Sequence, residues 1–413
     1  MHRTTIALAL FASALGGQTY DLLLKGGRVI DPKNRINSVM DVAISSGKIA
    51  RVAAGIPATD ARRVVNMVGL VVTPGLIDIH VHVYPRPENK AVERDSNVQA
   101  DAHTFRSGVT TVVDAGTSGW RNFPDFKARV AARAQTRVLA LLNISGAGMG
   151  TGKEDDVSEL NAEAAANAAK ANRDVVVGFK TAHFAGPGWE SVEAAVRAGK
   201  DADMPVMIDF GYMNQIRNLP TLLLDKLRAG DIYTHCYSGH REELLADGKV
   251  NPAMITGRKR GIFFDVGFGA GSFYWYVAVP AMQQGFAPDS ISTDLHTGSM
   301  NAGMKTMANA MSSILNLGSS LEQVVQMSTW NPARQIKRTE LGNLDVGAEA
   351  DVAVLRVSKG EYGFIDSAGA GNTGTERIVA ELTVRKGRVV WDLNSRAAES
   401  WKTFQYNRKK WTK

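Results

Sequence analysis

The stretch VVTPGLIDIHVH, residues 71–82, is an apolar run that ends in two histidines. Its aliphatic and β-branched residues predict a buried strand over 71–80. Alternate side chains of a strand share one face, so His80 and His82 point the same way. Two imidazoles placed like this can bind one metal ion, although a surface pair or two histidines bonded within the core would show the same spacing.

Seven further apolar runs follow, separated by alanine-rich or amphipathic stretches such as 158–171 and 189–202. This alternation is typical of a parallel sheet whose strands are connected by helices. Eight strand–helix units over about 250 residues predict an α/β fold of the TIM (β/α)8 barrel type. No Gly-x-Gly-x-x-Gly turn follows the first strand, which argues against a dinucleotide-binding fold. The eight runs are 71–80, 109–115, 138–145, 174–180, 205–211, 231–236, 261–267 and 290–294.

Both ends of the chain are rich in short β-like segments. Those at 20–30 and 41–52 precede the barrel, and those at 351–355 and 380–390 follow it, with Gly, Asp-Pro and Ser-Gly turns between them. At 413 residues and 44% hydrophobic content, the chain can build a second, smaller core. We therefore predict a small β-sandwich domain from residues 18–70 and 346–395, with the barrel at 71–345.

The two termini have compositions of their own. Residues 1–17 resemble a signal peptide, since Arg3 precedes the apolar run 6–15 and small residues follow where cleavage would occur. This run is too short to span a bilayer, and no longer apolar stretch suggests a membrane span. We expect export to a periplasm or the cell exterior, with an N-terminus that is packed or disordered as the alternative. The tail at 396–413 is basic, and the single Cys236 excludes an internal disulfide.

The net charge is modest. The 48 Lys and Arg against 41 Asp and Glu give +7, and apart from the end of the tail the excess is scattered. A nucleic-acid groove needs its basic residues on one face, so we expect a small-molecule substrate and no nucleic-acid partner.

Polar residues close several of the predicted strands, where a TIM barrel carries its reactive groups. His80 and His82 close the first strand; Lys180, Asp209, His235 and Asp294 close the fourth, fifth, sixth and eighth. Plain alternatives exist: Lys180 could pair with an aspartate, His235 could bond to backbone, and Asp294 could cap a helix. As a functional group, Lys180 could react with carbon dioxide to give a metal-bridging carbamate, and Asp294 could bind a metal and accept a proton from metal-bound water.

The segment TPGLIDIHVH at 73–82, with the later Lys, His and Asp in this order, resembles the amidohydrolase superfamily. The likeness runs from about residue 20 to 392 and includes VTTVVDAG at 109–116, Asn331-Pro332-Ala333 and GAEADVA at 347–353. DAGTSG at 114–119, THCYSG at 234–239 and FDVG at 264–267 resemble a dihydroorotase-like deacetylase branch.

This resemblance implies two divalent metal ions, with zinc expected and manganese as the alternative. One ion would be held by His80, His82 and Asp294, and the second by the residues closing strands five and six. Lys180, as N6-carboxylysine, would lie between the ions. A metal-bound hydroxide would attack the scissile carbonyl while the catalytic Asp294 shuttles its proton.

Two positions depart from the branch. Asp209 stands where a histidine is usual; it can still bind zinc, but it adds a negative charge that weakens Lewis acidity or favours manganese. Phe268 also replaces a histidine and cannot donate a hydrogen bond to a developing oxyanion. We expect Phe268 in an aromatic wall of the substrate pocket, where His183 and His296 are the candidate donors.

The sequence thus predicts a metal-dependent hydrolase that cleaves an amide or ester, such as an acyl group, of a small molecule. A cyclic-amide hydrolase of the dihydroorotase or hydantoinase kind is the alternative, weakened by the few basic residues that follow the strand ends. A catalytically silent barrel that acts as a binding or assembly module is the alternative from another class. Five ligand-type residues favour the enzyme, and a homo-oligomer stays open because barrels of this family often associate.

Overall fold

The run at 71–82 folds as two strands that belong to two different sheets. β5 (Val71–Pro74) pairs with β1 (Leu22–Asp31) and β13 (Val352–Ile365), whereas β6 (Leu76–Val81) begins the barrel. Gly75 lies between them, and a Cβ there would come within 2.2 Å of Thr110 Oγ1. Only glycine fits so close an approach, so the predicted single strand is divided at this residue.

The computed structural model describes residues 19–85, 97–209 and 214–406. The predicted leader at 1–17 and the last seven residues of the basic tail lie outside these ranges. Among the helices of the described residues, none combines the length and the apolar character needed to cross a bilayer.

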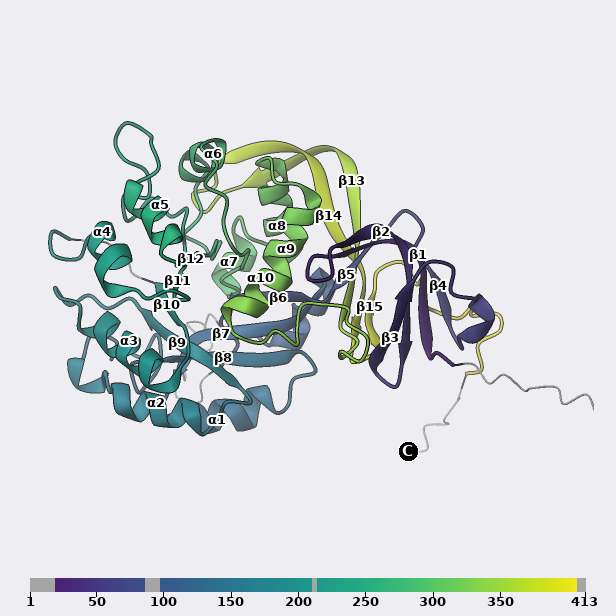
Figure 1. The fold of residues 1–413 in the computed structure, drawn as a ribbon, viewed down its shortest axis with the longest axis horizontal. Helices are drawn as coiled ribbons and strands as arrows, with labels where there is room; N and C mark the ends of the chain where they lie inside the picture. The colour runs from purple at the N-terminus through teal and green to yellow at the C-terminus, as the bar shows by residue number, and fades with distance from the viewer. Residues whose placement is uncertain (1–18, 86–96, 210–213, 407–413) are drawn as a thin grey trace, which may run out of the picture.

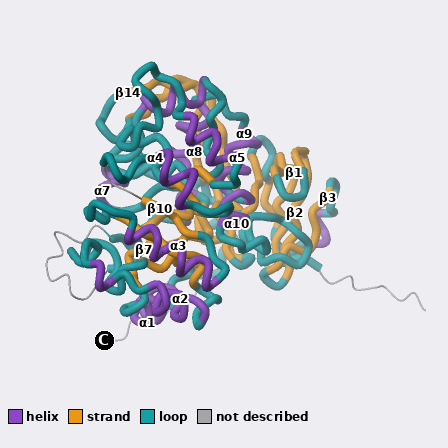
Figure 2. Tube along the Cα trace, turned by 60° about the vertical axis from the view of Figure 1, so that its left-hand side comes forward, coloured by secondary structure: helices purple, strands orange, loops and turns teal. Residues whose placement is uncertain are grey.

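The barrel sheet is parallel, and its strands follow one another in chain order from β6 to β12. Figure 2 shows these strands in the middle of the larger part of the molecule, with helices around them. After β6, the strands are β7 (Val109–Gly119), β8 (Arg137–Asn143), β9 (Val176–Ala182), β10 (Val206–Asp209), β11 (Ile232–Tyr233) and β12 (Phe263–Phe264). Each overlaps one of the predicted apolar runs, although β11 and β12 are shorter than predicted.

The eighth predicted strand closes the barrel as two isolated bridges. Ser290 pairs in parallel with Asp265 beyond β12, and Leu295 pairs in parallel with Val81 of β6. Between them, the backbone N–H of Thr293 donates to the Asp78 carboxylate at 3.1 Å rather than to a backbone carbonyl. Because a side chain accepts this hydrogen bond in place of a backbone carbonyl, the regular strand ladder is interrupted. The bridges on either side still close the sheet, which forms a TIM-like barrel.

Helices connect the strands and cover the barrel (Figure 1). The short α1 (Phe123–Phe126) and α4 (Leu219–Thr221) each run on into a π-helical turn, at 127–131 and 222–226. A buried cluster with side chains from every strand between β6 and β11 also includes Ala333 and Ile336 near one end of the barrel. The other helices are α2 (Ala162–Lys170), α3 (Glu190–Ala202), α5 (Pro252–Lys259), α6 (Trp275–Gln283), α7 (Thr297–Asn301), α8 (Met307–Asn316), α9 (Leu321–Ser328) and α10 (Trp330–Gln335).

The chain ends build one mixed sheet beside the barrel, in the order β15-β14-β13-β5-β1-β2-β3, with β4 paired to β1. Its other strands are β2 (Ile36–Ser45), β3 (Lys48–Ala53), β4 (Val64–Asn66), β14 (Gly371–Arg385) and β15 (Arg388–Asp392). Both termini thus contribute, whereas their arrangement as a β-sandwich stays a prediction. Figure 1 shows β13 and β14 leaving this sheet and running over α8 toward α6.

A partly buried ion-pair network joins the sheet to the barrel. Asp351 accepts hydrogen bonds from Arg137 of β8 at 2.9 Å and from Arg385 of β14 at 3.0 Å. Glu349 bonds to the same two guanidinium groups. Burial opposes ionisation of Glu349, but Arg137 and Arg385 prevail and lower its pKa.

We expect Asp351→Ala to reduce the free energy of unfolding by about 2 kcal/mol, because both guanidinium groups lose a hydrogen-bonded carboxylate and keep only the more exposed Glu349. The matched control is Asp247→Ala, which removes an exposed pair with Lys249 and should leave stability unchanged. Urea unfolding followed by circular dichroism measures both. Equal stabilities of the two variants would show that the network does not hold the sheet to the barrel.

Candidate active site

His80 is fixed by a chain of hydrogen bonds behind it. Thr234 Oγ1 donates to the buried Asp265 at 2.7 Å and lies 3.0 Å from His80 Nδ1. Because the hydroxyl proton goes to Asp265, the oxygen accepts from His80 Nδ1–H, and the His80 Nε2 lone pair faces the site. Ser290 and Ser292 also donate to Asp265, which holds the acceptor in place.

His82 and His235 are anchored in the same way. His82 Nδ1 lies 2.9 Å from Thr117 Oγ1, and Thr117 is itself bonded to the buried Asp114. His235 Nδ1 donates to the Gly267 carbonyl at 2.6 Å. All three histidines therefore use Nδ1 for support and present Nε2, the arrangement in which imidazole binds metal.

Lys180 lies at the centre of this group and is completely buried. Its Nζ is 3.0 Å from His80 Nε2 and 3.5 Å from Asp209 Oδ2. Asp209 Oδ2 is also 3.3 Å from His235 Nε2. Burial alone would raise the pKa of Asp209, but His235 and Lys180 outweigh it and hold that pKa well below its usual range.

Asp294 completes the cluster from the opposite side. Its Oδ1 is 3.0 Å from His82 Nε2 and 3.6 Å from His80 Nε2. Burial opposes its ionisation, yet the two histidines lower the pKa of Asp294 well below its usual range. Asp294 and His235 adopt positive φ angles of 51° and 60°. Such left-handed conformations are costly for residues with side chains and are often found at functional sites.

The cluster divides into two groups that fit metal ions. Ligand atoms of His80, His82 and Asp294 lie within 4.8 Å of one another, and so do those of His80, Asp209 and His235. Two atoms bonded to one tetrahedral zinc ion are about 3.3 Å apart, so ion binding would draw the most widely separated ligand atoms of either group together by up to about 1.5 Å. All six residues that were predicted from the sequence as metal ligands lie in this cluster.

A cavity of about 330 Å³ opens beside the cluster. Four of the six predicted ligands line it: His82, Asp209, His235 and Asp294. The remaining lining residues are Met149, His183, His240, Arg241, Ser272 and His296. This volume suits a small molecule and brings it directly to the ligand atoms.

Two of the predicted pocket residues line this cavity. His183 follows β9 in a left-handed conformation, 3.9 Å from Glu154. His296 caps α7, where its Nδ1 accepts the backbone N–H groups of Gly298 and Ser299. Burial lowers the pKa of His296, so the neutral ring carries its proton on Nε2, 3.8 Å from Asp294 Oδ2.

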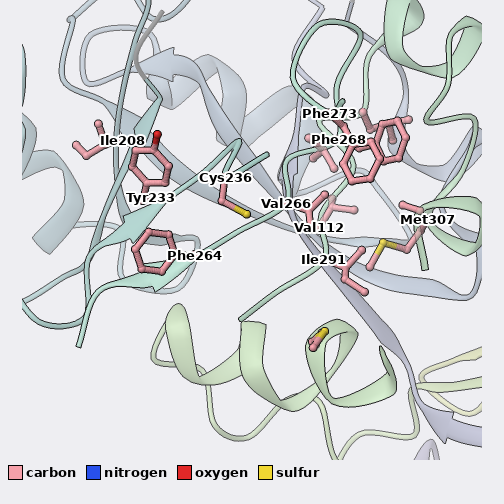
Figure 3. Packing of buried hydrophobic residues seen from close by; sticks show 14 of the residues in the cluster. Val112, Ile208, Tyr233, Cys236, Phe264, Val266, Phe268, Phe273, Ile291 and Met307 are labelled. Carbon is pink, nitrogen blue, oxygen red and sulfur yellow. The ribbon is translucent and has the colours of Figure 1, made fainter. Parts of the chain in front are cut away.

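Phe268 lies in the core instead of lining the cavity. Its ring is fully buried and stacks on Phe273 at a centroid distance of 4.2 Å, as Figure 3 shows. Trp275 packs edge-on against Phe273, whereas the Tyr276 side chain is exposed. The expected aromatic wall is therefore a core contact behind the site, since these rings bury more apolar surface against each other than in an aqueous cavity.

Arg241 and a hairpin tip were not identified from the sequence. Arg241 lies six residues beyond His235 in a stretch without strand or helix periodicity, and its guanidinium reaches Asp209 Oδ1 at 3.3 Å. The tip between β13 and β14 reaches the loop after β12, where Ser367 Oγ accepts the backbone N–H of Ser272 at 3.2 Å. Neither contact has a local sequence signal.

Comparisons with known proteins place this site in a family. Residues 83–391 match the model of the amidohydrolase family. A deacetylase of Enterococcus faecalis is 30% identical over 379 residues, which cover 90% of this chain and 99% of that protein. An adenine deaminase structure aligns with a TM-score of 0.81 at 29% identity, over 90% of this chain and 100% of the other. A dihydroorotase structure aligns with a TM-score of 0.76 at 26% identity, over 90% and 99%.

Gly116 tests how tightly the protein holds Lys180. It has a φ of 84°, and a Cβ there would lie 2.7 Å from Lys180 Cβ and Cγ. We expect Gly116→Ala to cost about 1–3 kcal/mol of unfolding free energy beyond the loss from the control Gly152→Ala. Gly152 has a φ of 73° and no atom within 4 Å of the added methyl group. Thermal unfolding measures the stability of both variants. Equal losses of unfolding free energy would mean that the Lys180 side chain can move aside for the added methyl group.

Proposed function

The chain belongs to the amidohydrolase family and is a hydrolase of carbon–nitrogen bonds, and we propose that it removes the acyl group from an N-acylated small molecule. One observation carries the proposal: three histidine Nε2 atoms and two carboxylates converge beside a cavity of small-molecule size. The deacetylase relative, matched over nearly its whole length, supports an acyl group as the part removed. Esters with the same acyl group are the alternative substrates.

We propose that the cluster holds two divalent ions, zinc in the first place and manganese as the alternative. The nitrogen and oxygen ligands suit either metal. When bound, such ions supply Lewis acidity and make hydroxide available near neutral pH. The Lys180 amine would add carbon dioxide and release a proton, giving a carbamate. Its Nζ, beside both His80 and Asp209, supports this modification.

Asp294 is the proposed proton carrier. It is ionised, it lines the cavity, and its Oδ2 is directed to the side where His296 lies. It would take the proton that the attacking water loses and deliver it to the leaving nitrogen, so that the amide gives a carboxylate and an amine. No second acid is needed, because the same carboxyl group first accepts the proton from water and then donates it to the leaving nitrogen.

His296 is the proposed hydrogen-bond donor to the substrate. Its Nδ1 is occupied by backbone N–H groups, so its Nε2–H faces the cavity. A donor fixed in this way can stabilise negative charge on a carbonyl oxygen. His296 would thus provide the hydrogen bond that the buried Phe268 ring cannot.

A cyclic-amide hydrolase is the second candidate. The structural likeness to a dihydroorotase favours it, as do His183, His240 and Arg241 in the cavity lining, because basic groups suit a substrate that carries a carboxylate. The sequence had shown few such groups. Arg241 is already bonded to Asp209, however, which favours the open-chain acyl substrate.

Two proposals concern the chain as a whole. Export rests on the leader-like residues 1–17, which lie outside the described residues. The division into a barrel and a β-sandwich domain rests on the segment pattern, and the mixed sheet built from both ends supports it.

The proposed function is tested with zinc-loaded protein, a panel of N-acetylated amines with and without a carboxylate, and a panel of cyclic amides. We expect amine release from the N-acetyl compounds, and Asp294→Asn should lower the rate by about 10²–10⁴-fold while most of the metal stays bound. The control is Asp247→Asn on the exposed surface. Turnover of cyclic amides alone would establish the second candidate. An unchanged rate in Asp294→Asn would remove this residue from proton transfer.

A further inference from the structure

The two carboxylate oxygens of Asp209 face different partners. Oδ2 faces the cluster, 3.3 Å from His235 Nε2 and 3.5 Å from Lys180 Nζ. Oδ1 faces away and accepts a hydrogen bond from the Arg241 guanidinium at 3.3 Å. Asp209 therefore connects the candidate metal cluster with a buried arginine.

Arg241 is held rigidly, and only 2% of its surface is exposed. Its second terminal nitrogen donates to the Thr234 carbonyl at 3.2 Å, and its guanidinium lies over the Tyr233 ring at 5.3 Å. Glu243 is a second nearby carboxylate, but its oxygens accept hydrogen bonds from Tyr233, Ser238 and the Arg241 backbone N–H. The guanidinium group is thus directed at Asp209 by its contacts with the Thr234 carbonyl and the Tyr233 ring.

We propose that Arg241 is a positioning residue that cancels the additional negative charge of Asp209 and directs its Oδ2 toward the metal ions. The Asp209–Arg241 pair then acts as an electrically neutral ligand, as a histidine in this position would. The proposal rests on the proposed function, since it requires bound ions.

If the Asp209–Arg241 pair acts as one ligand, changing either residue should alter the affinity for metal ions, which a merely structural contact would not do. Without Arg241, Asp209 would lose the hydrogen bond that directs its Oδ2 toward the ions, and this buried carboxylate would be free to rotate. With histidine in place of Asp209, Arg241 would lose the carboxylate that lies between it and the ions, and its charge would repel them. Each single substitution should therefore weaken metal binding, and the two together should restore it.

A double-mutant cycle in zinc affinity tests this expectation. Metal-free Arg241→Met, Asp209→His, the double variant and the unchanged protein are titrated with zinc against a chromogenic chelator. We expect each single variant to bind zinc about 10-fold more weakly, since outer partners of ligands contribute at this level. The double variant should come within about threefold of the unchanged protein, far from additive behaviour.

Arg258→Met is the matched control. Arg258 also pairs with an aspartate, Asp289, and lies over aromatic rings, but it is absent from the cavity lining. Combined with Asp209→His, it should change zinc affinity additively. Thermal midpoints of all metal-free variants show whether each one folds.

Three outcomes would overturn the proposal. Additive losses in the Asp209–Arg241 cycle would mean that the two residues do not act as one ligand. Unchanged zinc affinity in Arg241→Met, with a raised KM that Asp209→His does not reverse, would make Arg241 a substrate contact. Absence of zinc binding by the unchanged protein would refute the proposed metal site itself, and the metal-free midpoints would then report only on a structural pair.

Discussion

The site depends on which ring nitrogen each histidine uses for support. A histidine can bind a metal through Nε2 only if that atom keeps its lone pair, and a hydrogen bond from Nδ1–H fixes that tautomer. Thr234 supports His80, Thr117 supports His82, and the Gly267 carbonyl supports His235. The carboxylates behind the two threonines are buried, so the whole arrangement is held without help from solvent.

The same supports tie the site to the barrel. Asp265 follows β12, Thr234 follows β11, and the serines that bond Asp265 belong to the segment that closes the barrel. Ligand geometry and barrel closure therefore share one hydrogen-bond network. The tip of the β13–β14 hairpin is also connected to the site, because Ser367 Oγ accepts the backbone N–H of Ser272, a residue of the cavity lining. The sheet built from both chain ends thus contributes to the shape of the cavity.

The six candidate ligands could be predicted from the sequence because each closes an apolar run, and the C-terminal ends of parallel strands meet at one edge. What could not be predicted depends on contacts between distant residues. The division at Gly75 follows from its approach to Thr110, and the broken eighth strand follows from Asp78. Phe268 was expected in the pocket from its place in a motif, but its stacking on Phe273 depends on the path of the following loop. Arg241 lies in an irregular segment that no periodicity marks.

The most direct test of this account is the metal content of the protein, measured by elemental analysis after purification with bicarbonate and without chelators. Because His80 offers a single nitrogen, it serves one ion with His82 and Asp294, and Asp209 and His235 with a carboxylated Lys180 would hold a second, which predicts about two divalent ions per chain. Loss of one ion on removal of bicarbonate would agree with a carbamate on Lys180. One ion or none under all conditions would contradict the account, because the convergent histidines and carboxylates would then have no shared metal site to form.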